Sequence, residues 1–299
     1  MDSELSQFER EGWQGCLAML TLGGSYNGGK LRILNRVTIS ENVSMIDKEL
    51  SSNRVFEILK LLSLNQGEHI MVSVAKALPN ERQEFIKKTY THLAGAVAAF
   101  VLVEFILFQT GIAAGITSFI SGNRFGWLMI IGGFSLLGWM SRSLIAKADD
   151  PNSQYAGLGM YIVGEALIFA PILYIAAYYA NDPNLIPMAA ILTGMMFAGI
   201  TAIAFTTKQD FSFLGNFLRI GGFIALGLII CSVLFGFTLG LIFSALMIVF
   251  ASAAILYTTS NIIHRYQTHQ YVAASLELFA SVALLFYYIL MTLLRSSRN

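Results

Sequence analysis

Hydrophobic and polar residues are distributed very unevenly along this chain of 299 residues. From about residue 92 onward apolar residues run almost continuously, and only short clusters of Gly, Pro, Asn and charged residues interrupt them. A helix needs about 20 such residues to cross a hydrocarbon layer of about 30 Å. The interruptions leave seven segments, at about 92–118, 126–147, 156–180, 185–207, 216–235, 238–261 and 271–294. Backbone groups in lipid must be paired within the chain, so the pattern predicts an all-α membrane protein with seven transmembrane helices.

The beginning of the chain has a different pattern, which predicts a small soluble extension over residues 1–80 and a membrane domain over 81–299. A strand is expected at 31–39, and a helix at 53–64. The helix prediction rests on apolar residues spaced i, i+3, i+4, i+7, which form a stripe of Val55, Ile58, Leu59 and Leu62. So short a segment supplies little core of its own. We therefore expect this stripe to dock on the membrane domain or on a partner protein.

Charge reinforces this division of the chain. Only 12% of the residues are charged, against about 25% in a soluble domain. Of the 37 charged residues, 22 lie in residues 1–90, with 11 basic and 11 acidic. The charged run at 81–90 is expected to lie along the membrane surface before the first span. The net charge of +1, without a basic patch, excludes a nucleic-acid-binding protein.

The positions of basic residues predict the orientation in the membrane. Apart from the basic residues that precede the first span, four fall in the second, fourth and sixth loops, whereas the odd loops hold only Arg124; the four are Arg142, Lys147, Lys208 and Arg265. Lys and Arg favour the cytoplasmic side, so the N-terminus is expected inside. Seven spans then place the C-terminus outside, although Arg295 and Arg298 mildly oppose the rule.

Ionisable residues inside the predicted spans are the candidate functional site. Glu104, Glu165 and Glu277 lie in the first, third and seventh segments. A charge at membrane depth is costly, so such residues commonly mark a functional site. Glu104 and Glu165 either line a polar cavity or are protonated and hydrogen-bonded to a neighbouring helix, and Glu277 is close enough to a span end to lie at the interface. Arg142 either pairs with one of these acids or extends to the headgroups.

Other kinds of chemistry have few residues to support them. Cys16 and Cys231 lie far apart, without the spacing of a disulfide framework or a zinc site. His264 and His269 are five residues apart in a predicted loop, which does not favour a metal site. The sequence contains no Gly-rich phosphate loop, no HExxH and no nucleophile elbow. We therefore expect no enzyme activity, no cofactor and no metal.

Several stretches of the chain resemble the Bax inhibitor-1 (transmembrane Bax-inhibitor-motif) family in its bacterial branch. They are FIKKTY at 85–90, FTTKQDFSFLG at 205–215, LYTTS at 256–260 and the last span, LFASVALLFYYIL at 278–290. The resemblance covers about residues 81–294. It implies six helices around a central, final seventh helix, in a multi-pass protein of the bacterial inner membrane.

The same resemblance implies two kinds of function. Some members are pH-sensitive calcium leak channels, and some bacterial members bind and restrain a membrane-anchored ATP-dependent protease. In the leak channels two aspartates share a proton, because two adjacent carboxylates do not ionise together easily. Here Tyr257-Thr258-Thr259-Ser260 stands in place of the family's Tyr-Asp-Thr-Gln, and Ser281 stands in place of the second aspartate. Both acids of the pH sensor are missing.

Two hypotheses of function follow. In the first, this protein binds and modulates or scaffolds another membrane complex, which is favoured by the missing sensor acids and the long N-terminal extension. In the second, the bundle conducts a cation or a proton through the interior acids Glu104 and Glu165. The sequence identifies neither the partner nor the ion.

Overall fold

A computed structural model describes residues 74–297, except 76, 123–125, 147–150, 181, 208, 236 and 238. The described residues belong to one compact unit. The strand predicted at 31–39, the helix predicted at 53–64 and the stripe of Val55, Ile58, Leu59 and Leu62 lie outside the described residues, and so does Cys16.

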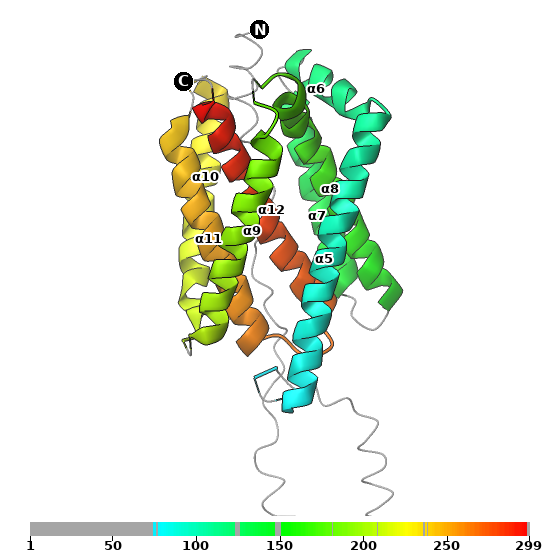
Figure 1. The fold of residues 1–299 in the computed structure, drawn as a ribbon, viewed down its shortest axis with the longest axis vertical. Coiled ribbons are helices and arrows are strands. Elements are labelled where there is room, and N and C mark those ends of the chain that lie inside the picture. The colour runs from blue at the N-terminus through cyan, green and yellow to red at the C-terminus, as the bar shows by residue number, and fades with distance from the viewer. Residues whose placement is uncertain are drawn as a thin grey trace, which may run out of the picture. The chain divides into compact units, whose positions relative to one another are not determined.

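The part of the chain that the structure describes is helical and contains no strand, so the all-α prediction is confirmed. Figure 1 shows long helices side by side in a bundle. They are α5 (Pro79–Gln109), α6 (Ile112–Gly122), α7 (Gly126–Ala146), α8 (Pro151–Tyr178), α9 (Leu185–Thr206), α10 (Leu214–Phe235), α11 (Gly240–His264) and α12 (Tyr271–Ser296), with a 3₁₀ turn, η1 (Phe211–Phe213), before α10.

Six helices of the described chain are long and apolar enough to cross a membrane. They correspond to α5, α8, α9, α10 (joined to η1), α11 and α12. Helix α7 has 21 residues and coincides with the second predicted segment, but it is not among these six. The chain is therefore a multi-pass membrane protein.

The single span predicted at 92–118 is wrong. The structure divides this region into α5, which ends at Gln109, and the separate helix α6, which begins at Ile112. Between them the Thr110 N–H donates to the carbonyl of Ile106, and Gly111 has a φ of 73°. Glycine adopts this left-handed conformation without steric cost, so the backbone turns here even though apolar residues continue on both sides.

The surface run predicted at 81–90 is also corrected. Helix α5 begins at Pro79. Proline has no backbone N–H, and this costs least at the first position of a helix, where the N–H has no partner within the helix. It continues for 31 residues without a break, so the charged run forms the first turns of the same helix that enters the apolar region.

Helices α8 and α12 form the interior of the bundle. In their most apolar windows, 72% of α8 and 67% of α12 is buried, against 17–28% for the other four candidate spans. Helix α12 packs against α5, α7, α8, α9 and α11. Aromatic rings join these elements: Phe169 of α8 lies 5.3 Å from Phe100 of α5 and 5.8 Å from Phe286 of α12, between ring centroids.

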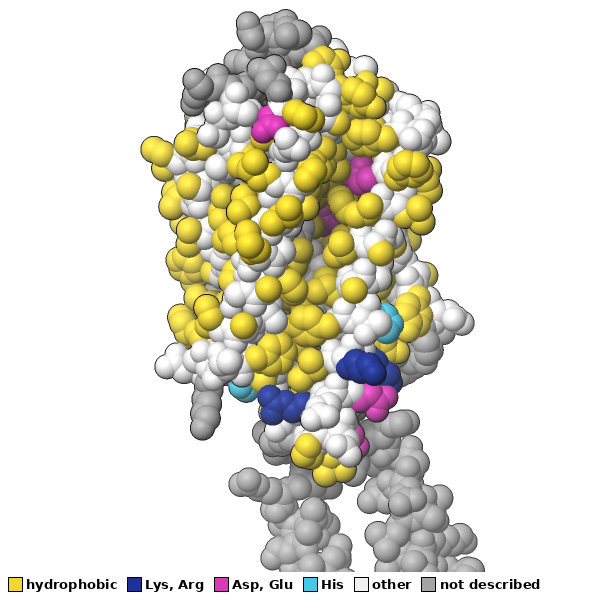
Figure 2. Space-filling model, viewed as in Figure 1, with side chains coloured by type: hydrophobic (Ala, Val, Ile, Leu, Met, Phe, Trp, Pro, Cys, Tyr) yellow, Lys and Arg dark blue, Asp and Glu magenta, His cyan; other side chains and the backbone are white. Residues whose placement is uncertain are grey.

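The outer surface carries many large apolar side chains. Large hydrophobic side chains such as Phe105, Phe223, Ile242 and Val249 are more than half exposed. Figure 2 shows this hydrophobic surface over most of the bundle, with the basic side chains gathered at the lower end, where α5 begins. Such a surface is typical of a protein that is embedded in a membrane.

Helices α7 and α8 approach each other very closely. The Ser141 hydroxyl donates to the carbonyl of Gly157 at 2.6 Å. A Cβ added at Gly157 would lie 2.7 Å from the Ser141 carbonyl oxygen. Small residues allow such contacts where lipid offers no hydrophobic drive for helix association. This contact fixes Arg142, the next residue of α7, beside α8.

Candidate intramembrane polar site

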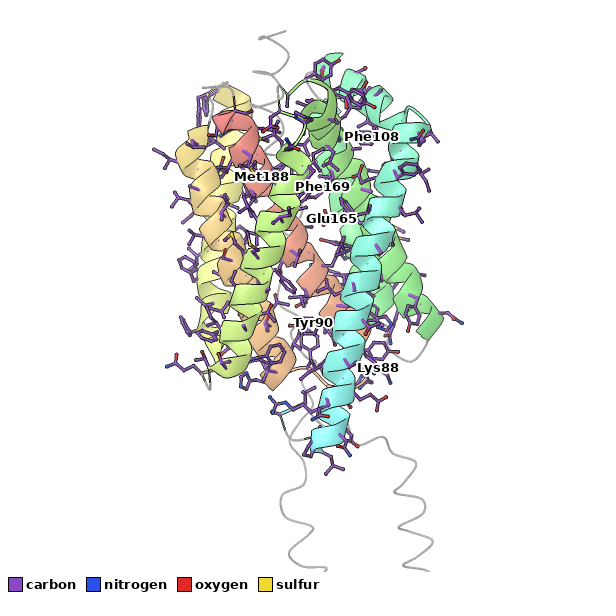
Figure 3. All side chains as sticks on the ribbon, viewed as in Figure 1. Lys88, Tyr90, Phe108, Glu165, Phe169 and Met188 are labelled. Atoms are coloured by element: carbon purple, nitrogen blue, oxygen red, sulfur yellow. The ribbon has the colours of Figure 1, made fainter. Side chains whose placement is uncertain are left out.

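Glu165 is the most deeply buried acid of the described chain. It lies near the middle of α8, is 0% exposed, and appears at mid-height of the bundle in Figure 3. Tyr161, one helical turn earlier, interacts with the Glu165 carboxyl and with the Arg142 guanidinium of α7. Arg142 also interacts electrostatically with Glu165. The three side chains therefore form one polar cluster, and the cation of that cluster comes from a different helix.

Arg142 offsets part of the cost of burying the polar groups of this cluster. Removing an isolated charge from water costs several kcal/mol, and a partner of opposite sign in good geometry offsets part of that cost. Arg142 is half-buried, with its Nε atom out of contact with solvent.

Glu277 lies near the start of α12 and is half-buried. It contacts Tyr266, in the connection between α11 and α12, and Arg142 lies within electrostatic range of the same tyrosine. Burial, followed by the negative charge of Glu277, raises the pKa of the Tyr266 phenol well above its usual value. Arg142 therefore interacts with Tyr161, the neighbour of Glu165, and with Tyr266, the neighbour of Glu277.

Glu104 is not part of this cluster. It lies on α5, is 6% exposed, and neither carboxyl oxygen has a hydrogen-bond partner among the described residues. The carboxyl oxygens of Glu165 likewise have no hydrogen-bond partner among the described residues, but only Glu165 interacts with Tyr161 and Arg142. The structure thus brings Arg142 to Glu165 but leaves Glu104 as a separate buried acid. Figure 2 shows acidic atoms set back between α5 and α9, within the hydrophobic surface.

Thr258 and Ser281 face each other between α11 and α12. Their hydroxyl oxygens are 3.4 Å apart, and both residues are buried. The Ser281 hydroxyl also donates to the carbonyl of Glu277 at 2.9 Å. Its single hydrogen is thereby used, so Thr258 is the donor between the two hydroxyls. Neither group carries a charge.

Asp210 caps the start of η1. Its carboxylate accepts from the backbone N–H of Ser212 at 2.9 Å, at the start of η1. It also lies 3.8 Å from the guanidinium of Arg265. The Ser260 hydroxyl accepts from the N–H of Phe211 at 3.0 Å. The loop before α10 is therefore fastened to the end of α11.

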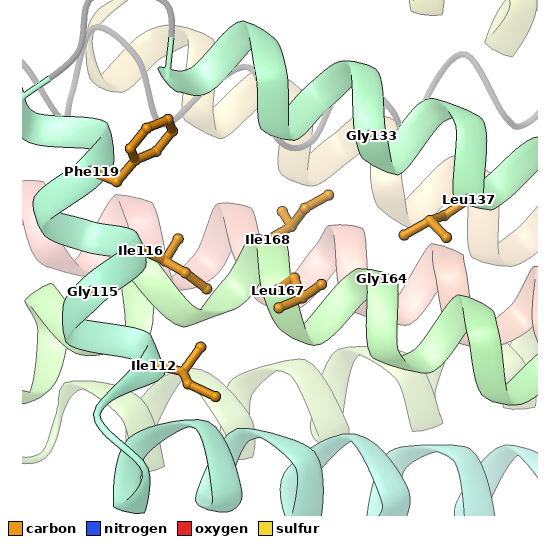
Figure 4. Close-up of a pocket in the computed structure, with 9 residues that line it drawn as sticks. All are labelled: Ile112, Gly115, Ile116, Phe119, Gly133, Leu137, Gly164, Leu167 and Ile168. Carbon is orange, nitrogen blue, oxygen red and sulfur yellow. The ribbon is translucent and has the colours of Figure 1, made fainter.

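A cavity of about 540 Å³ lies among α6, α7 and α8 (Figure 4). Its lining includes Gly164, Leu167 and Ile168, which flank Glu165 in sequence. All the lining residues are apolar or glycine; the others are Ile112, Gly115, Ile116, Phe119, Gly133 and Leu137. None of the side chains that line this cavity is polar, so they offer no ligand to a hydrated ion.

The structure places His264 at the end of α11. His264 is the last residue of α11 rather than a loop residue, and its Nδ1 donates to the carbonyl of Ser260 at 2.9 Å. Among the described residues there is no group of three His, Cys, Asp or Glu that could hold a metal ion.

The sequence alone did not identify two residues of this region, Tyr161 and Tyr266. Tyr161 has a detectable signal, because it precedes Glu165 by four residues and so shares its helix face. Tyr266 has no such signal, because its contact with Glu277 depends on how α12 turns back from the loop.

Comparison with known proteins decides the family. The model of the family described as "Inhibitor of apoptosis-promoting Bax1" matches residues 82–299. The chain belongs to the Bax inhibitor-1 family. The expected resemblance is confirmed.

Three relatives illustrate the range of proteins that this Bax inhibitor-1 family chain is similar to. An uncharacterized protein of Pseudomonas aeruginosa is 38% identical over 39% of this chain and 52% of its own length. The Escherichia coli protein named modulator of FtsH protease YccA is 35% identical over 44% of this chain and 60% of its own. A vaccinia virus protein named Golgi anti-apoptotic protein is 27% identical over 76% and 92%.

The chain spans about half the length of the first bacterial relatives it matches, 52% and 55%. No solved structure matches the chain.

Proposed function

We propose that this protein binds another membrane complex and modulates or scaffolds it, with a membrane-anchored protease as the class of partner. The observation that carries the proposal is the neutral pair Thr258 and Ser281, whose hydroxyls lie 3.4 Å apart where the family's leak channels have two acids. Hydroxyls provide neither a charge nor a titration near neutral pH. The E. coli relative named as a modulator of FtsH protease supports this class of partner.

The proposed topology has seven spans, with α7 as the additional one, and six helices around α12. The packing of α12 against five other helices supports this arrangement. We place the protein in the bacterial inner membrane with its N-terminus in the cytoplasm and its C-terminus outside, which the distribution of basic residues supports. The N-terminal extension would then lie on the cytoplasmic side, where it could dock on a cytoplasmic domain of the protease.

The experiment is a co-purification. The full chain, carrying an affinity tag, is expressed in E. coli lacking YccA, extracted in mild detergent and probed for FtsH. The proposal expects FtsH to be retained by the full chain and lost when residues 1–78 are deleted, while the deleted protein still inserts in the membrane. If the full chain retains no FtsH, the choice of protease is wrong. If the truncated chain retains as much FtsH as the full chain, the docking role of residues 1–78 is wrong.

A second candidate is a cation or proton leak through the bundle. Glu104, which is buried and has no hydrogen-bond partner among the described residues, and the cluster of Glu165 with Arg142 favour it, because buried ionisable groups commonly belong to ion or proton pathways. Proteoliposomes loaded with a pH dye or a calcium dye test it. A leak that Glu104→Gln or Glu165→Gln abolishes supports this candidate, and ion-tight proteoliposomes refute it.

A further inference from the structure

A groove lies on the outer surface of the bundle, between α5 and α8. Its volume is about 310 Å³. One end is apolar, with Ala96, Leu158 and Ile162, and the other is polar, with Thr91, His92 and Tyr155. A Cβ added at Gly95 or Gly159 would meet no atom within 4 Å. Two glycines on facing helices thus leave open space at the apolar end.

The polar end is held in place by a connected set of rings. The Nδ1 of His92 is 2.7 Å from the Lys88 carbonyl, which can only accept, so Nδ1 carries a proton. The Nε2 is 3.0 Å from the Tyr155 hydroxyl, which in turn is 3.4 Å from the hydroxyl of Tyr271. The rings of His92 and Tyr155 stack with centroids 5.6 Å apart. This end of the groove is therefore preformed.

Lys88 adds positive charge to the polar end. It lies one turn before His92 on the same helix face, toward the lower end of α5 in Figure 3. Its ammonium is 5.5 Å from the centre of the Tyr271 ring and 2.7 Å from the carboxylate of Glu84. The side chains of Lys88 and Glu84 are 48% and 65% exposed. An exposed pair of this kind contributes little stability, so an incoming anion can compete for the ammonium.

We propose that this groove binds one anionic phospholipid, with the phosphate at Lys88 and Thr91 and one acyl chain over Gly95 and Gly159. The groove has the polarity of that ligand: the cation and the hydroxyl lie at the charged end of the bundle, and the apolar end continues toward the hydrophobic surface. Lysine and aromatic residues near a span end are typical of the headgroup region of a bilayer. A soluble phosphate compound would leave the apolar end empty.

The test is native mass spectrometry of the full chain in detergent, titrated with phosphatidylglycerol or phosphatidylcholine. One phosphatidylglycerol is expected to bind with an affinity clearly above that of phosphatidylcholine. Lys88→Gln should weaken the binding of phosphatidylglycerol about tenfold, which is the usual effect of losing a charged hydrogen bond. Glu84→Gln should strengthen the binding of phosphatidylglycerol, because the Glu84 carboxylate no longer competes for the Lys88 ammonium. Gly159→Leu should block the acyl chain, and Gly194→Leu, at an open position on α9, is its matched control.

Several outcomes would overturn the proposal. Equal binding by the Lys88→Gln and Glu84→Gln proteins would exclude the phosphate contact, and unchanged binding by Gly159→Leu would exclude the acyl position. Displacement of the lipid by millimolar inorganic phosphate alone would indicate a simple anion site. If a variant misfolds, cross-linking of a photoreactive phosphatidylglycerol to the unmodified protein decides: the proposal requires adducts within residues 88–96 and 155–162.

Discussion

The hydroxyls of Thr258 and Ser281 face each other at 3.4 Å between α11 and α12. Their separation would bring two carboxylates close enough to share a proton if aspartates replaced them. One of those carboxyls would have a raised pKa, so raising the pH through that value would add a second negative charge to the pair.

The first prediction follows from this geometry. The Thr258→Asp, Ser281→Asp double variant should give proteoliposomes a cation leak that changes with pH across the neutral range. The leak is measured by dye fluorescence at a series of pH values. Thr258→Asn with Ser281→Asn is the control of similar size, and it should show no such dependence. A pH-gated leak in the unmodified protein would mean that other residues sense pH.

The second prediction concerns the contact between α7 and α8. Gly157→Ala should destabilise the protein by about 1–3 kcal/mol, because the new methyl group meets the Ser141 carbonyl oxygen, which belongs to the backbone and cannot easily move. Gly159→Ala, two residues later in open space, should be close to neutral. Unfolding of the purified proteins in detergent measures both. Equal losses would contradict the close approach of these helices.

The third prediction tests the Arg142 cluster. Residues of one polar network are energetically coupled, so Arg142→Gln and Glu165→Gln should be non-additive by about 0.5–3 kcal/mol. Glu104→Gln should add independently to Arg142→Gln, because Glu104 is not among the residues that interact with Arg142, which are Tyr161, Glu165 and Tyr266. A double-mutant cycle on the free energy of unfolding measures both couplings. Coupling of equal size for Glu104 would show that the two acids share one site.

The fourth prediction concerns alkaline pH. Tyr266 has its pKa raised in the folded protein by burial and by Glu277, whereas the unfolded chain titrates near pH 10. Above about pH 10 the unfolded state therefore binds fewer protons than the folded state, and stability falls as pH rises. Tyr266→Phe should reduce this fall. Thermal unfolding between pH 8 and 11 measures the difference, and parallel curves would contradict it.

Hydropathy predicted most of the membrane domain because long apolar runs and polar breaks are local signals. The predicted segments at 185–207 and 271–294 agree with α9 (Leu185–Thr206) and α12 (Tyr271–Ser296) within two residues. The break between α5 and α6 was missed, because it depends on the backbone conformation of Gly111 rather than on polarity.

The candidate site shows the same limit. Each of Glu104, Glu165, Glu277 and Arg142 is conspicuous in an apolar sequence, and all four are at least half-buried. Which acid Arg142 joins could not be predicted, because that depends on the packing of α7 against α8.

The most direct test of the central claim is the rate of proteolysis by FtsH in proteoliposomes, measured with a membrane-protein substrate at increasing ratios of this protein to the protease. The account predicts that the full chain changes the rate by at least about twofold and that the effect saturates, while the chain without residues 1–78 has no effect at the same ratios. An unchanged rate at every ratio, with both proteins present in the same vesicles, would contradict it.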